Sequence, residues 1–75
     1  MSATATPRYW MGTTPVSCDV CSKPFETSFI DGATRGGPWA NMCLRCHREI
    51  GAGIGQGQGQ LYQRQTDGRW LKTEG

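Results

Sequence analysis

Four cysteines stand in two pairs of equal spacing, Cys18 with Cys21 and Cys43 with Cys46. The pattern C-x2-C-x21-C-x2-C places two thiolates on each of two tight turns, and tetrahedral Zn²⁺ takes four such ligands. The gap between the pairs is one residue longer than the usual range, a difference that a loop can absorb. The sequence therefore predicts one structural zinc ion, bound by Cys18, Cys21, Cys43 and Cys46.

Disulfides are the main structural alternative for four cysteines in a small chain. Residues 1–8 contain no apolar stretch of the kind found in secretory leaders. We therefore expect a reducing, cytoplasmic location, where thiols stay free for metal. Iron bound as in rubredoxins is disfavoured, because Ser22 and His47 stand where glycines are expected after each cysteine pair.

Two short motifs around His47 suggest other chemistry. The run Cys43–His47 is a literal C-x-x-C-H, but haem attachment would leave the first cysteine pair unexplained. His47 and Glu49 form the H-x-E of zinc deaminases, yet here it follows the C-x-x-C instead of preceding it, and four thiolates leave no position for an activated water. A redox C-x-x-C usually sits in a βαβ context, which the chain lacks. We expect His47 at the surface, and we expect no enzyme.

A chain of this size needs a bound metal or another cross-link to stabilise its fold. With 75 residues and 36% hydrophobic composition, it is one domain with too little apolar surface for a large core. A structural zinc contributes on the order of 10 kcal/mol in finger peptides, which is comparable to the whole stability of a small domain. Metal binding and folding are thus expected to be one event.

The elements around the cysteines predict a small α+β zinc-stabilised domain. Residues 18–24 have the form of a zinc knuckle, whose backbone N–H groups turn toward the sulfurs. A strand over 25–30, turn residues at 31–38 and a returning strand over 39–42 form a hairpin. A helix then opens at Cys43 and stops at Gly51. This order predicts a treble-clef-like finger; a zinc ribbon is the alternative.

The flanking segments complete the predicted organisation. Residues 1–15 read as a flexible N-terminal arm, with Tyr9 and Trp10 expected to dock on the domain at 16–75. Residues 51–60 form a Gly/Gln-rich connector, read as a flexible linker, as a bare backbone face that allows close packing, or as free amides for phosphate contact. Residues 61–73 form a C-terminal hairpin around Asp67-Gly68. Trp39 and Trp70 are expected in the core.

The charge of the chain permits a nucleic-acid partner. The net charge is +2, and six of the eight cations are arginines, the planar and bidentate choice for phosphate. We expect a non-catalytic binding module with nucleic-acid binding slightly favoured over a protein partner, no small-molecule substrate, and no membrane span. The candidate partner-binding residues are Arg35, Arg45, Arg48, Arg64 and Arg69.

Three stretches of the chain resemble the small single-finger proteins encoded by tailed bacteriophages. They are Cys18–Phe25, Asp31–His47 and Gly57–Tyr62, and the resemblance covers roughly residues 18–72. It implies a four-cysteine zinc finger in the cytoplasm of an infected bacterium. The metal ligands are all that transfers residue by residue, and the resemblance implies no common activity.

Overall fold

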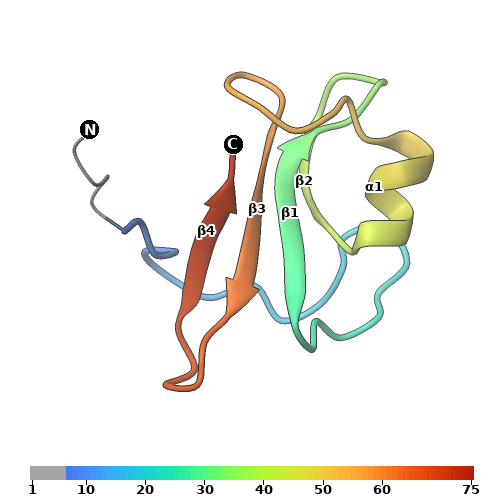
Figure 1. Ribbon diagram of the computed structural model, residues 1–75. Helices are drawn as coiled ribbons and strands as arrows, with labels where there is room; N and C mark the ends of the chain where they lie inside the picture. Colours follow the sequence, from blue (N-terminus) through green and yellow to red (C-terminus); the bar gives the residue numbers. More distant parts are fainter. Residues whose placement is uncertain (1–6) are drawn as a thin grey trace, which may run out of the picture.

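Four strands and one short helix make up the computed structural model, which describes residues 7–75. In chain order they are β1 (Ser28–Ala33), β2 (Trp39–Met42), α1 (Leu44–Ile50), β3 (Gly59–Arg64) and β4 (Trp70–Glu74). The strands form one antiparallel sheet in the order β2-β1-β3-β4, and α1 lies at the β2 end of it (Figure 1). The prediction of a small α+β domain is confirmed. The two expected hairpins are not separate units, because β1 and β3 pair and join them.

The first hairpin begins later than the sequence predicts. Phe25 belongs to the knuckle instead of the strand, since its N–H donates to the Val16 carbonyl at 2.9 Å. Asp31 and Gly32, predicted as turn residues, lie inside β1 opposite Asn41 and Ala40. The prediction was wrong because glycine serves here for close backbone approach, not for a turn.

That close approach occurs where β1 meets β3. Gly32 and Gly59 are register partners, and a Cβ atom on Gly32 would lie 2.9 Å from the Gly59 Cα atom. A Cβ atom on Gly59 would lie 2.6 Å from the Gly53 carbonyl oxygen. The glycine-rich connector over 51–60 therefore packs on the sheet, and its last two residues are part of β3. Of the three readings of the connector, the structure favours close packing.

Helix α1 begins and ends as predicted, but packing and not a left-handed glycine explains where it ends. Cys43 is its N-cap, and Gly51 ends it with φ −75°, which is ordinary extended backbone. Gly51 pairs with Thr34 in an isolated β-bridge, and a Cβ atom on Gly51 would collide with the His47 ring. Gly51 is thus required by packing against His47 and not by a left-handed conformation.

An aromatic cluster fills one side of the sheet. Phe29, with no solvent exposure, stacks between Phe25 and Tyr62 at centroid distances of 5.1 Å on both sides. Trp10 and Trp70 meet the Phe29 ring edge-on at 5.4 and 5.0 Å. Trp70 is in the core as expected.

Trp39 is not in the core, since it is 53% exposed. Strand alternation explains the difference: Ala40 and Met42 of β2 pack against the core, so Trp39 points to the other face.

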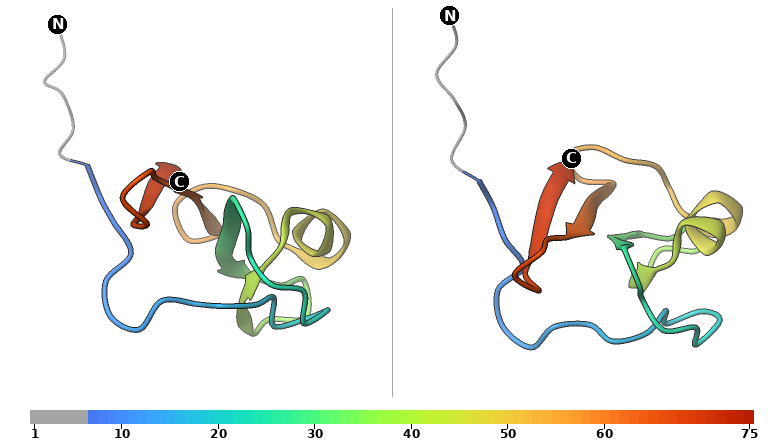
Figure 2. Two further views of the ribbon diagram at one scale, coloured as in Figure 1. Left: turned by 90° about the horizontal axis from the view of Figure 1, so that it is seen from below. Right: turned by 60° about the horizontal axis from the view of Figure 1, so that its bottom comes forward.

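The N-terminal segment runs along the outer edge of β4. The Trp10 N–H donates to the Trp70 carbonyl at 2.9 Å, and the Lys72 N–H donates to the Arg8 carbonyl at 2.7 Å. The segment then crosses to the knuckle beneath the sheet (Figure 2). Trp10 docks on the domain as expected. The predicted arm at 1–15 therefore contacts β4 through residues 8 and 10. The rest of that arm, residues 1–6, lies outside the described residues.

Candidate functional site

The four cysteine sulfurs converge at the junction of the knuckle, the end of β2 and the start of α1. All four Sγ atoms lie within 4.8 Å of one another, and Cys21 and Cys43 are 3.8 Å apart. A tetrahedron with Zn–S bonds of about 2.3 Å has S–S edges of about 3.8 Å. All four thiols are free, with no disulfide among them. The predicted cysteines thus form a group that could hold one metal ion, and its size fits zinc.

Backbone N–H groups point at the sulfurs. The Cys18 sulfur accepts from the N–H of Val20 at 3.4 Å and from the N–H of Cys43 at 3.3 Å. The Cys43 sulfur accepts from the Cys46 N–H at 3.4 Å, which is the N-cap bond of α1. These contacts are those expected of a knuckle and of a helix start facing thiolates. They stabilise negative charge on sulfur.

The thiols of Cys18 and Cys46 differ strongly in pKa. Burial raises the pKa of Cys18, but the backbone N–H groups of Cys21, Cys43 and Val20 lower it by more, so that its pKa is about 6. Burial, the neighbouring thiols and the charge of Cys18 together raise the pKa of Cys46 to about 12. The protein alone therefore favours the thiolate form of Cys18 and disfavours the thiolate form of Cys46. A divalent cation would reverse that opposition, because it supplies the charge that the clustered sulfurs lack.

The knuckle is tied to the sheet by a pair of hydrogen bonds. The Asp19 N–H donates to the Asn41 carbonyl, and the Asn41 N–H donates to the Asp19 carboxylate, both at 2.8 Å. This pairing fixes the first cysteine pair against β2, which leads directly into the second pair. Asp19 is not among the residues predicted from the sequence. Its position between Cys18 and Cys21 is the only sequence feature that points to this role.

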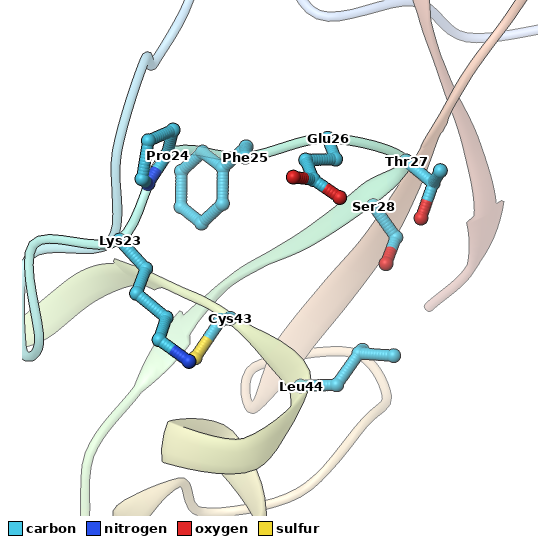
Figure 3. Close-up of a pocket in the computed structure, with 8 residues that line it drawn as sticks. All are labelled: Lys23, Pro24, Phe25, Glu26, Thr27, Ser28, Cys43 and Leu44. Carbon is cyan, nitrogen blue, oxygen red and sulfur yellow. The ribbon is translucent and has the colours of Figure 1, made fainter.

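A cleft opens beside the cysteine group, with the segment from Lys23 to Ser28 on one side and the start of α1 on the other (Figure 3). Cys43 and Leu44 line it from the helix side. Cys21 and Cys43 are partly exposed, whereas Cys18 and Cys46 are buried. The cysteine group therefore has an open side and a buried side.

The five candidate arginines fall into two groups and one isolated residue. Arg35 and Arg48 line one cleft between the β1–β2 turn and α1. Arg64 lies over the Trp70 ring at 5.7 Å, and Arg69 lies over the Tyr9 ring at 3.9 Å while pairing with Asp67. Arg45 is exposed on α1 outside that cleft. Of the five candidates, Arg35 and Arg48 are thus the two that the fold brings to one cleft.

His47, expected at the surface, is half-buried. Its Nε2 atom lies 2.9 Å from the Gly53 carbonyl oxygen, so the ring ties α1 to the connector. This contact explains the presence of His47 without a metal role, since four cysteines already supply the ligands.

No protein-family profile, curated protein sequence or solved structure matches the chain. Among the described residues, no helix has the length and apolar character needed to cross a membrane.

Proposed function

We propose that the protein is a non-catalytic, zinc-stabilised binding module. The observation that carries the proposal is the group of four cysteine sulfurs, whose largest separation is 4.8 Å. Cys18, Cys21, Cys43 and Cys46 would hold one Zn²⁺, whose charge would compensate the thiolates and join both halves of the chain. The order of knuckle, hairpin and helix supports a treble-clef-like arrangement of the ligands.

A structural role for the metal follows from the ligand set. Four thiolates complete a tetrahedral shell, so a zinc bound there has no open position for a water or a substrate. Within residues 7–75, no second group of histidine, cysteine and acidic side chains is placed to hold a metal. The metal centre therefore supports a surface instead of a reaction.

We favour nucleic acid as the partner of that surface. The chain carries a net charge of +2, and Arg35, Arg45 and Arg48 project from the finger without an ion pair among the described residues. An origin in a tailed bacteriophage is part of the proposal and rests on the sequence resemblance. Such a small basic module would act in the cytoplasm of the host.

Two measurements test the proposal. Elemental analysis of protein purified without added metal should return about one zinc per chain. Labelled single- and double-stranded DNA and RNA should bind at low salt and dissociate steeply between about 50 and 200 mM salt, because phosphate contacts release counterions. Absence of any complex at low salt would reject nucleic acid as the partner.

A protein partner is the second candidate, and exposed apolar side chains favour it. Trp39 is 53% exposed and Val16 is 75% exposed. Exposed tryptophan is enriched at protein interfaces relative to the rest of the protein surface. If nucleic acid fails to bind, capture of partners from bacterial lysate on the wild-type chain and on Trp39→Ala tests this alternative.

A further inference from the structure

We propose that the cleft lined by Arg35 and Arg48 binds a backbone phosphate of a nucleic-acid strand. This inference rests on the proposed function and adds to it by assigning the contact to one pair of arginines. The cleft measures about 520 Å³ and lies between the β1–β2 turn, α1 and the beginning of the connector. These three segments meet at one end of the sheet in Figure 1.

Two segments bring the arginines to the cleft, and backbone hydrogen bonds hold those segments together. The Arg35 N–H donates to the Ile50 carbonyl at 2.8 Å, which joins the turn to the end of α1. The Ala52 N–H donates to the Ala33 carbonyl at 2.9 Å, just beyond it. The backbone that carries both arginines is therefore fixed before any ligand arrives, which lowers the entropic cost of binding.

The lining of the cleft suits an anion with an apolar neighbour. It includes the two arginines and His47 but no acidic residue, and the apolar side chains of Ile30 and Leu44 complete it. Among residues 7–75, neither Arg35 nor Arg48 makes an ion pair. Their guanidinium groups are thus available to a ligand, while the exposed side chain of Leu44 offers an apolar surface to a sugar ring.

The two guanidinium groups suit a backbone phosphate. Its two non-bridging oxygens carry lone pairs for more than one donor, so both arginine forks can bond to a single phosphate. Arg64 and Arg69 differ from this pair, because each already lies over an aromatic ring of the protein. We therefore assign phosphate contact to the first pair and a structural role to the second.

Two double variants test the assignment, Arg35→Gln/Arg48→Gln and Arg64→Gln/Arg69→Gln. Both remove two positive charges, so the long-range attraction of nucleic acid falls equally in both. Zinc content and a dispersed amide spectrum establish that each variant is folded. The readout is the slope of log affinity against log salt for a short labelled single-stranded oligonucleotide.

The first variant should lose about 0.7 of that slope, which corresponds to one phosphate contact, and the second should lose less. In the wild-type protein, the oligonucleotide should shift the backbone amide signals of Arg35, Gly51 and Gly53. An unchanged slope in Arg35→Gln/Arg48→Gln, with wild-type binding intact, would overturn the assignment while the proposed function stands. Absence of wild-type binding would overturn both.

An acidic peptide provides the remaining arm of the experiment. A glutamate-rich peptide at the same charge concentration should displace the oligonucleotide poorly, because it has no sugar ring to pack beside the bound anion. Efficient displacement, with shifts of the same amide signals, would contradict the choice of phosphate and indicate an acidic protein segment as the ligand.

Discussion

At the scale of single residues, Asp31 and Asp67 sit in opposite electrostatic settings. Burial and the nearby charge of Asp19 raise the pKa of Asp31 above its ordinary value. Hydrogen bonds from the backbone and side chain of Arg69 lower the pKa of Asp67. A raised carboxyl pKa means that the ionised form destabilises the fold at neutral pH, and a lowered pKa means that it stabilises the fold.

Asparagine substitutions at these two positions should therefore act in opposite directions. At pH 7 and equal zinc excess, Asp31→Asn should raise Tm by less than the 4–8 °C that about 1 kcal/mol gives in a domain of this size. Asp67→Asn should lower Tm slightly, since its ion pair with Arg69 is exposed. Thermal unfolding followed by circular dichroism measures both. Shifts of the same sign would contradict the electrostatic account.

At the scale of the elements, the contact between β1 and β3 depends on glycine. Gly59→Ala should destabilise the domain by about 1–3 kcal/mol, because its Cβ atom would overlap the Gly53 carbonyl and force the connector away from the sheet. Gly36→Ala is the matched control, since a Cβ atom there meets only the Thr34 hydroxyl at 4.0 Å. Urea unfolding of both variants measures the difference. Equal stability would show that the connector does not pack as described.

The N-terminal segment should likewise contribute to stability through Trp10. Trp10→Ala removes two edge-to-face contacts, with Phe29 and Tyr62, both at 5.4 Å. Truncation of a buried aromatic residue costs about 3–5 kcal/mol, so this partly buried one should cost about 2–3. Trp39→Ala should change stability by no more than about 0.5 kcal/mol, as for an exposed residue. A larger effect at Trp39 than at Trp10 in urea unfolding would contradict the described core.

Local patterns predicted the parts of the fold that depend on neighbouring residues. The metal ligands, the helix after Cys43 and the strand over 39–42 each follow from spacing, capping or alternation within a few residues. The sheet order did not follow, because the pairing of Gly32 with Gly59 joins distant segments. The turn predicted at Asp31-Gly32 is wrong for the same reason. Close backbone approach at Gly32 is required only because β3 lies alongside β1.

The arginine cleft could be predicted only in part. A spacing of three residues on α1 places Arg45 and Arg48 near each other. The structure instead joins Arg48 to Arg35 through the bridge between Thr34 and Gly51. That long-range contact has no sequence signal of its own. The aromatic partners of Arg64 and Arg69 depend in the same way on the fold of the N-terminal segment and β4.

At the scale of the whole molecule, the group of four cysteines brings together the two halves of the chain. Cys43→Ala should release zinc and unfold the domain, because three thiolates hold zinc weakly and the core is small. Leu44→Ala is the control, since its side chain is 46% exposed and its loss should change stability by at most about 0.5 kcal/mol. Circular dichroism and zinc content measure both. A cooperative thermal transition in metal-free Cys43→Ala would contradict this dependence.

Removal of the metal from the wild-type chain tests the central claim most directly. Amide proton and nitrogen correlation spectra recorded during titration with a strong chelator should lose their dispersion as zinc leaves, and they should regain it when zinc is added back. The free energy of metal binding is then the free energy of folding. A dispersed spectrum that stays unchanged after complete removal of zinc would contradict the account.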